Sequence, residues 1–557
     1  MTGAGSMNWD AIIVGAGHNG LAAAVHLGFK GWKVLVLEQA ATAGGAVKTA
    51  EVTLPGFRHD LYAMNLSMFA GSPFYAAHKA RLDAAGLALL PATHSFASVF
   101  DDGRWLGVDT DLASTCARIA ARNPRDAETW RSMQAGFGAD APHLFALLGS
   151  PVPSWALGRV VWTMWRSKGL AWCMETLRML LSSPRSWLTA RFEDEGLQAM
   201  MAAWGMHLDF GPDVAGGALF PYLESMANQA FGMALGQGGA DTIIRAMVRV
   251  IEQQGGEVRT HATVASIDVL DGQARAVVLA DASRIPAGKA VIANIHPRLL
   301  YGRLLATPPA DTLASSPGSG SRTVDVSSRN ARTAPLLAPT SPLPAPARLR
   351  PGPGTMMIHL ALRDLPAWRA GPELRRFAYV HIAPSLDQMA RTYREAMAGL
   401  LPAEPVLVVG QPTVYDPGRA PAGQHVLWVQ VRVLPTDIRG DAAGLLQPAH
   451  WDQLKDAYAE RALALLERHA PGTGSQVLAR HVMSPVDLER DNPNLVGGDS
   501  LSGSHHLDQF FCFRPAFGHS RWRTGVKDLY MVGASTWPGA GTGAGSGFML
   551  AKDLAGA

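Results

Sequence analysis

Six residues near the N-terminus have the types and spacing of a turn that binds a diphosphate. Gly15-Ala16-Gly17-His18-Asn19-Gly20 follows an apolar run, Ala11 to Val14, and opens an alanine-rich stretch. The first glycine permits a tight bend, the second lets the backbone approach a pyrophosphate, and the third packs a helix against a strand. The start of that helix directs unpaired amides and a positive dipole at the anion. The pattern predicts binding of a dinucleotide.

An acidic residue supports this prediction. Residues 33–37 form a second apolar run that predicts a strand, and Glu38 ends it 18 positions after Gly20. A carboxylate there accepts hydrogen bonds from a ribose hydroxyl. It also repels a 2′-phosphate, which disfavours NADP. The alternative is a glycine-rich turn without a ligand, and the run of strand, turn, helix and acid makes this the weaker interpretation.

Two further segments resemble parts of FAD-dependent oxidoreductases of the amine oxidase and phytoene desaturase type. Gly44-Gly45 follows Glu38 by six positions, where those families often have a GGR pattern; here Ala46 replaces the arginine and Lys48 is the nearest cation. Leu529 to Ala544 resembles the strand and glycine-rich turn that close over the flavin. Only ten residues follow Gly547, too few for a second nucleotide motif, so one dinucleotide is expected.

The whole chain is identified as a member of the phytoene desaturase-like FAD-dependent oxidoreductases, in the branch of carotene ketolases and pyridine nucleotide-disulphide oxidoreductase-domain proteins. Gly238 to Asp241 and Val258 to Asn294 resemble the family's second cofactor-binding stretch, whereas residues 306–354 have no counterpart. The resemblance implies FAD as the cofactor, with no metal. The predicted cofactor-binding residues are Gly15, Ala16, Gly17, His18, Asn19, Gly20, Glu38, Gln39, Gly44, Gly45, Ala46, Val264, Ala293, Asn294, Gly533, Ala534, Pro538, Gly539, Gly541, Thr542, Gly543 and Ala544.

The resemblance implies a reaction on a hydrophobic, carotenoid-like polyene or lipid: desaturation, isomerisation or oxygenation, with electrons passed to oxygen or a quinone. Direct reduction by NAD(P)H is disfavoured because no second nucleotide motif is visible. Two alternatives stay open. One is an FAD-dependent oxidase of small amines or metabolites, for which Trp537 would form one wall of an aromatic cage. The other is a flavin-binding partner protein with little turnover.

The catalytic base is not identified by the sequence. Desaturation can proceed with the flavin as hydride acceptor and a nearby base taking the proton. The candidates are His59, Asp60, His505, His506 and Gln509. The first two follow Pro55-Gly56-Phe57 and the others precede the terminal strand, so either group could lie beside the flavin. For both groups a structural hydrogen-bonding role is the more common one. Arg514 is expected to anchor the chain or lie beside the cofactor.

A chain of 557 residues is expected to form more than one domain. The predicted class is α/β: a Rossmann-type FAD-binding domain from discontinuous segments (8–75, 232–300 and 515–557), a mixed α+β substrate domain (76–140 and 355–514) and a helical lid or membrane-facing region (141–231). Apolar spacing predicts helices over 241–254 and 451–468, and strands over 258–269 and 274–279 joined by a tight turn. Residues 306–354 contain ten prolines and predict a flexible Pro/Ser-rich insertion.

Charge and cysteine content exclude several classes of function. A net charge of +3 is too small to indicate a nucleic-acid-binding protein. Cys116, Cys173 and Cys512 are too far apart to suggest a disulfide framework, a redox dithiol or a zinc site, and the last two are expected to be buried. No signal peptide and no spanning helix are expected. These features favour a cytoplasmic setting.

Tryptophan and basic residues concentrate in residues 155–192. The segment has five tryptophans and six basic residues: Trp155, Trp162, Trp165, Trp172, Trp187, Arg159, Arg166, Lys168, Arg178, Arg185 and Arg191. This mixture suits a helical hairpin that lies on an anionic membrane, which would place the protein peripherally on the inner face. The alternative is a lid whose tryptophans pack in the core or at a subunit contact. The oligomeric state is not predicted.

Overall fold

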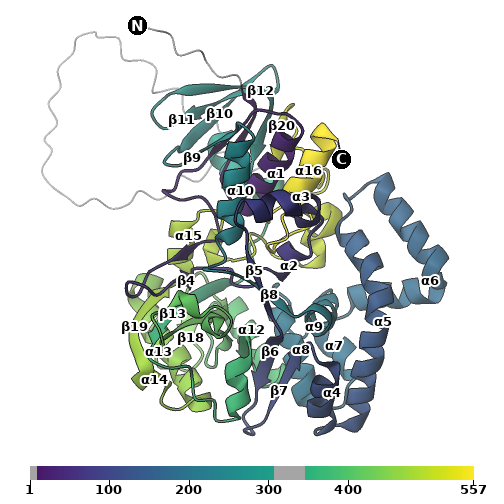
Figure 1. The fold of residues 1–557 in the computed structure, drawn as a ribbon, viewed down its shortest axis with the longest axis vertical. Coiled ribbons are helices and arrows are strands. Elements are labelled where there is room, and N and C mark those ends of the chain that lie inside the picture. The colour runs from purple at the N-terminus through teal and green to yellow at the C-terminus, as the bar shows by residue number, and fades with distance from the viewer. Residues whose placement is uncertain (1–8, 306–344, 557) are drawn as a thin grey trace, which may run out of the picture.

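The fold is described from a computed structural model, for residues 9–305 and 345–556 (Figure 1). Most of the predicted insertion, residues 306–344, lies outside the described residues. Its last part forms a short 3-10 turn, Ala345–Arg348, which is followed after five residues by a long strand, Gly354–Leu362.

Five parallel strands from distant parts of the chain form the centre of the first sheet. Their order is β9 (Glu257–Arg259), β2 (Val34–Leu37), β1 (Trp9–Val14), β12 (Arg284–Ala293) and β20 (Leu529–Met531). Val14 lies opposite both Leu37 and Ala293, and Ala293 lies opposite Met531. The strands therefore end together, and the residues that follow them meet at one edge of the sheet.

The two faces of this sheet are covered differently. One face packs on helices α1 (His18–Phe29), α3 (Pro73–Ala84), α10 (Thr242–Gln253) and α16 (Gly545–Ala555). The other packs on the antiparallel pair β10 (Val264–Leu270) and β11 (Gln273–Leu279). Asp271 and Gly272 join that pair with φ of 52° and 70°, the left-handed pair of a type I′ turn. The predicted strand over 258–269 is in fact two strands, β9 and β10, in different parts of the sheet.

A second, mixed sheet of seven strands lies beneath the first in Figure 1. Its order is β19 (Val477–Met483), β13 (Gly354–Leu362), β17 (His425–Leu434), β16 (Val406–Gly410), β14 (Tyr379–Ile382), β6 (His94–Val99) and β7 (Trp105–Asp109). One face packs on α13 (Trp451–His469), the helix predicted over 451–468. The other packs on α8 (Glu195–Met206) and α9 (Leu219–Phe231).

Short two-stranded sheets and small helices connect these parts. The sheets are β3 (Thr49–Ala50) with β4 (His59–Asp60), β5 (Leu89–Ala92) with β8 (Met233–Gly236), and β15 (Leu400–Leu401) with β18 (Gly440–Asp441). The helices include α2 (Ser67–Ala70), α7 (Pro184–Thr189), α11 (Pro297–Leu299), α12 (Leu386–Met397), α14 (Thr473–Gln476) and α15 (Pro485–Asp491).

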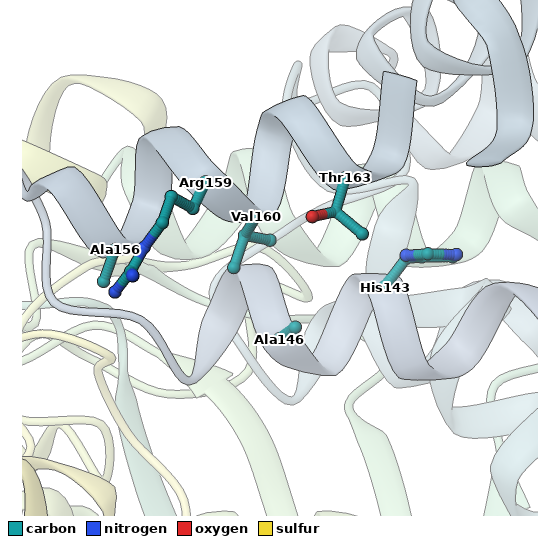
Figure 2. Close-up of a pocket in the computed structure, with 6 residues that line it drawn as sticks. All are labelled: His143, Ala146, Ala156, Arg159, Val160 and Thr163. Carbon is teal, nitrogen blue, oxygen red and sulfur yellow. The ribbon is translucent and has the colours of Figure 1, made fainter. Parts of the chain in front are cut away.

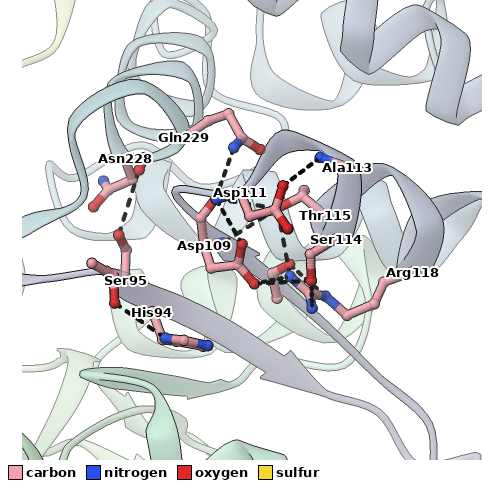
Figure 3. Close-up of polar contacts among 12 residues, drawn as sticks. His94, Ser95, Asp109, Asp111, Ala113, Ser114, Thr115, Arg118, Asn228 and Gln229 are labelled. Atoms are coloured by element: carbon pink, nitrogen blue, oxygen red, sulfur yellow. Dashed lines mark hydrogen bonds and ion pairs between the residues drawn. The ribbon is translucent and has the colours of Figure 1, made fainter.

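A polar network fastens the helical region to the second sheet. Arg118 on α4 (Leu112–Ala120) pairs with Asp109 at the end of β7 at 2.6 Å, and Gln229 on α9 donates to the Asp109 carbonyl at 2.7 Å (Figure 3). Trp130 on α5 (Pro124–Leu148) donates to Gln229 at 3.1 Å. Side chains from four elements thus converge beside one strand end.

Helix α6 (Trp155–Leu181) extends away from the body as two helical segments that meet at Gly169, where φ is 82° (Figure 1). A pocket between α5 and α6 is lined by His143, Ala146, Ala156, Arg159, Val160 and Thr163 (Figure 2). Trp187 is buried, whereas Trp155, Trp162 and Trp165 are exposed, so for these three the alternative of packing in the core of this chain is wrong.

The α/β class with a Rossmann-type domain, a mixed second sheet and a helical region is confirmed. The expected burial of Cys173 and Cys512 is wrong, because both side chains are partly exposed. Cys173 lies on the protruding α6, and Cys512 lies in an irregular 3-10 turn, so the apolar neighbours in sequence do not enclose either one. Cys116 is buried.

Candidate functional site

A cleft opens where the strands of the first sheet end. Its wall includes the residues that follow β1, β2 and β12, together with Arg303 and the turn Asp491–Asn494. Of the predicted cofactor-binding residues, it is lined by Gly15, Gly17, Glu38, Gln39, Gly45, Val264 and Asn294. In parallel α/β sheets this carboxyl edge is the usual ligand site.

Asn294 holds the glycine turn in place. Its side-chain amide donates to the carbonyls of Gly15 at 3.0 Å and Gly17 at 3.3 Å. A Cβ on Gly15 would lie 2.8 Å from the Asn294 carbonyl oxygen, and φ of Gly15 is 96°. A Cβ on Gly20 would lie 2.7 Å from the Gly15 carbonyl oxygen. Gly15 therefore needs glycine for both conformation and close approach, and Gly20 for close approach.

The turn and the acid fit the ADP half of FAD. No side chain caps the N-terminus of α1, so its first amides are not occupied by a side-chain oxygen. The Glu38 carboxylate accepts from the amides of Ala16 and Ala40, both at 2.9 Å, one to each oxygen. A carboxylate has about four acceptor positions, so Glu38 retains capacity for ribose hydroxyls. The predicted role of Glu38 is compatible with this geometry.

Residues outside the motifs complete the cleft. Lys48 lies in its wall and pairs with Asp491 at 3.0 Å, and the Tyr62 hydroxyl donates to the same carboxylate. The guanidinium-bearing Arg303 also lines the cleft. Sequence reasoning named Lys48 only as the nearest cation and missed Arg303 and the turn at 491–494. Nothing in their local sequence marks them, because the fold brings them to the cleft from far along the chain.

The C-terminal segment lies directly against the glycine turn. His18 and the Gly541 carbonyl are hydrogen-bonded at 3.0 Å, and a Cβ on Gly533 would lie 3.1 Å from Asn294 Oδ1. A Cβ on Gly547 would lie 1.8 Å from the Asn19 carbonyl oxygen, so α16 packs on α1 without an intervening side chain. The chain is therefore fixed to the glycine turn at Gly533 and at Gly547. Between these two points lie the predicted flavin-covering residues Ala534, Pro538, Gly539, Thr542, Gly543 and Ala544.

Arg514 organises the approach to that segment. Its side chain is completely buried and donates to the carbonyls of Ala534 at 2.7 Å, Ser504 at 2.7 Å and Gly503 at 3.1 Å. Burial lowers the pKa of Arg514 to about 10, so it stays charged at neutral pH. The structure therefore gives Arg514 an anchoring role, through backbone carbonyls.

His59 and Asp60 are both buried and both engaged. Asp60 forms an ion pair with Arg419 and accepts from the Thr49 hydroxyl and the Ala240 amide, each at 2.7 Å. His59 is bonded to the Thr53 hydroxyl at 2.8 Å, and burial lowers its pKa to about 4. These partners favour structural roles for both residues.

The second group of candidates is also held by the protein. His505 accepts from the Ala540 amide at 3.0 Å and so positions the C-terminal segment. His506 is bonded to the Asp209 carbonyl at 2.9 Å. Gln509 bonds both the amide and the carbonyl of Arg350, at 2.7 and 2.9 Å. The geometry favours structural roles here too, and the catalytic base is not identified.

Trp537 does not form the wall of an aromatic cage. The ring is completely buried, its indole nitrogen donates to the Ser150 carbonyl at 2.7 Å, and it packs on Phe510 and Phe511 with ring centroids 5.2 Å away. It is therefore part of a small apolar core.

Comparisons with known proteins agree with the fold. Residues 13–80 match the family model of the NAD(P)-binding Rossmann-like domain. The chain is 26% identical to pyridine nucleotide-disulfide oxidoreductase domain-containing protein 2 of Mus musculus, over 96% of this chain and 91% of that protein. It is 26% identical to a neurosporene-forming phytoene desaturase of Cereibacter sphaeroides, over 97% of this chain and 94% of that enzyme.

Solved structures show the same fold. An oxidoreductase from Methanosarcina mazei matches with a TM-score of 0.58 and 17% identity, over 98% of this chain and 99% of that one. A putrescine oxidase matches with a TM-score of 0.55 and 15% identity, over 99% and 98%. The relatives confirm the predicted relationship to the phytoene desaturase-like FAD-dependent oxidoreductases, and with it an oxidoreductase of the FAD-binding type.

Proposed function

We propose that this chain is an FAD-dependent oxidoreductase of a hydrophobic, polyene-like or lipid substrate, with oxygen or a quinone as electron acceptor. The observation that carries the proposal is an apolar core that extends from the FAD-binding segment at Tyr62 and Met64 to α8 and α9 and contains ten methionines. Methionine is flexible and polarisable, and it adapts to long apolar ligands of irregular shape. FAD would supply the acceptor for a hydride or an electron pair.

The chain's own residues would hold the ADP half and exclude water. The glycine turn would approach the pyrophosphate, Glu38 would bind the ribose, and the segment around Gly541 would cover the flavin side. Oxidation of small amines is the weaker alternative, because Trp537 is enclosed in its own core. The other alternative, a flavin-binding partner protein with little turnover, predicts that no substrate reduces the bound FAD, and the following test distinguishes it from an enzyme.

The test is anaerobic reduction of the bound FAD. Isoprenoid hydrocarbons or alcohols are expected to bleach the visible flavin absorbance of the purified holoenzyme, and a quinone or oxygen to restore it. Putrescine is expected to have no effect. Glu38→Ala is expected to weaken FAD binding by roughly 10- to 100-fold, because it removes a charged acceptor for the ribose. Bleaching by amines alone, or by no compound, contradicts the proposal.

We further propose that α6 contacts an anionic membrane surface. Trp155, Trp162 and Trp165 on this helix are 93%, 61% and 41% exposed, and the rings of the last two are 4.8 Å apart. The exposed Arg159 and Arg166 have no ion-pair partner in the described part of the chain. Among the described helices, none combines the length and apolarity needed to cross a bilayer. Exposed tryptophan beside unpaired arginine suits a peripheral contact.

Flotation with phosphatidylglycerol-containing vesicles tests this contact. Trp162→Ser with Trp165→Ser is expected to reduce the bound fraction at least severalfold, because transfer of two indole rings to the interface is lost. Leu445→Ser is the control, since Leu445 is 78% exposed and lies outside α6. Equal flotation of the two variants, or a change in oligomeric state without a change in flotation, contradicts a membrane contact.

A further inference from the structure

The two faces of the second sheet differ in polarity although both are buried. The face against α13 is wholly apolar at Val99, Val380, Ile382, Leu407, Val429 and Val431. The register places the alternate residues on the opposite face, which we call the polar face. Beside the apolar Phe96, Val406 and Val408 it carries six side chains with polar atoms: Ser98, Tyr379, His381, Trp428, Gln430 and Arg432. All six are buried. Apolar packing alone would favour the same residue types on both faces.

Several polar atoms on this face have no partner. His381 is 1% exposed, and neither of its ring nitrogens is hydrogen-bonded within the described part of the chain. The Ser98 hydroxyl, which lies opposite His381 in the register, is likewise unpartnered there. Burial lowers the pKa of His381 to about 3, so the ring is neutral, with one donor and one acceptor. Buried polar groups without partners are rare in native proteins and require a water or a ligand.

Two ring side chains at the C-terminal end of helix α8, Trp204 and His207, lie beside His381. The ring of Trp204 lies 5.3 Å from that of His381, and the ring of His207 lies 4.8 Å from Trp204 and 5.3 Å from His381. Trp204 Nε1 and His207 Nε2 are buried, and neither has a partner among the described residues. Three rings in mutual contact therefore each carry a free nitrogen.

Arg432 adds a charge at the edge of this cluster. Its guanidinium donates to the Met206 and Ser500 oxygens at 3.2 and 3.1 Å, yet its buried Nε has no partner in the part of the chain that is described. The next residue, Val433, has φ of 63°. A β-branched residue in the left-handed region is strained, and such strain concentrates at functional sites.

We propose that the cluster of His381, Trp204, His207 and Arg432 binds an oxygen function of the substrate, a hydroxyl, carbonyl or carboxylate on an otherwise apolar molecule. An oxygen accepts from the free donors of Trp204 and Arg432, and His381 can donate or accept. The surrounding methionine-rich core takes the hydrocarbon part. This inference rests on the proposed function and narrows its substrate class from hydrophobic polyenes or lipids in general to those that carry an oxygen group.

The test compares matched ligands on the holoenzyme. Dissociation constants are measured for C10, C15 and C40 isoprenoids with and without a terminal hydroxyl, such as farnesol against farnesene and zeaxanthin against β-carotene. The oxygenated member of a pair is expected to bind at least about tenfold more tightly. His381→Leu and Trp204→Phe are each expected to reduce this preference by roughly tenfold.

Thermal stability provides a second readout. His381→Leu is expected to maintain or raise the melting temperature, because it removes buried nitrogens that have no partner. Ile382→Ala is the matched control: it lies on the same strand and packs against α13, so it should lower the melting temperature and leave the ligand preference unchanged.

The outcomes separate the two proposals. Equal affinity within every pair, or a preference unchanged in both variants, overturns the oxygen site and points to bound water, while flavin bleaching by the hydrocarbons would still support the proposed function. A melting temperature lowered by His381→Leu with the preference intact assigns His381 to the core and also overturns the site. If no member of any pair binds or bleaches the flavin, the proposed function itself fails.

Discussion

Arg419→Met is expected to lower the free energy of unfolding by about 3–5 kcal/mol, because it leaves buried carboxylates without their cation. Arg419 is completely buried and pairs with Asp60 and, at 3.0 Å, with Asp416. It also donates to the Gly236 carbonyl at 2.7 Å. Burial alone would lower the pKa of Arg419, but the ion pairs with both carboxylates raise it. The two carboxylates therefore offset the cost of burying the guanidinium.

The ion pairs of Arg419 with Asp60 and Asp416 join separate elements of the fold, which makes the expected loss of stability large. Asp60 also accepts from the Ala240 amide and Asp416 from the Gly238 amide, so Arg419 joins β4 to the turn that precedes α10. These elements lie in the predicted FAD-binding segments 8–75 and 232–300, so FAD content is expected to fall together with stability. Denaturant unfolding and flavin content measure both effects.

A double variant separates pairing from packing. Asp60→Asn with Arg419→Met is expected to cost less than the sum of the single changes, since it removes a buried anion together with its cation. Arg178→Met, which breaks the exposed pair with Glu175, is the control and should have little effect. An Arg419→Met protein that unfolds like the wild type would show that the network contributes nothing.

Local sequence predicted the parts of the site that one continuous segment specifies. Gly15, Gly20 and Glu38 are recognisable because the turn, the helix and the acid lie within a single βαβ unit. The helices at 242–253 and 451–469 were likewise visible from spacing alone. Asn294 was named through a family resemblance, yet its bonds to the Gly15 and Gly17 carbonyls follow only from the alignment of β12 beside β1.

The remaining features depend on contacts between distant segments. Asp491 reaches Lys48 and Tyr62 across more than four hundred residues, and no local pattern marks such a partner. The buried strand Tyr379–Ile382 reads as an ordinary apolar strand interrupted by one histidine. The strand register places His381 opposite Ser98, and the ring of His381 lies 5.3 Å from that of Trp204 on α8. Only these contacts show that the histidine shares its face with other unpartnered groups.

Acidification from pH 6.5 toward 4 is expected to destabilise the protein steeply. Burial lowers the pKa of His59 to about 4 and the pKa values of His296 and His381 to about 3, whereas each is about 6.5 in an unfolded chain. Below pH 6.5 the unfolded state thus binds more protons than the folded state. Their contribution is full above pH 6.5, is lost as the pH falls, and levels off near the folded pKa values.

His59, His296 and His381 together set the slope of the free energy of unfolding against pH. Each fully titrating histidine changes the free energy of unfolding by up to about 1.4 kcal/mol per pH unit, so three give about 4 kcal/mol per unit near pH 5. The carboxylate of Asp441 acts in a lower pH window. Burial alone would raise the pKa of Asp441, but the hydrogen bond from Arg461 holds it at about 2. Its stabilising effect is therefore lost only below about pH 4.

Proton uptake on unfolding measures the histidine term directly. Titration of native and urea-unfolded protein at pH 5 is expected to show that the unfolded chain binds at least about three more protons. His381→Leu should reduce this difference by about one proton, because the substituted side chain does not titrate in either state. Equal proton binding by the native and unfolded states at pH 5 would mean that the buried imidazoles are already protonated in the folded protein. His381 would then not be neutral, and its assignment as both donor and acceptor would fail.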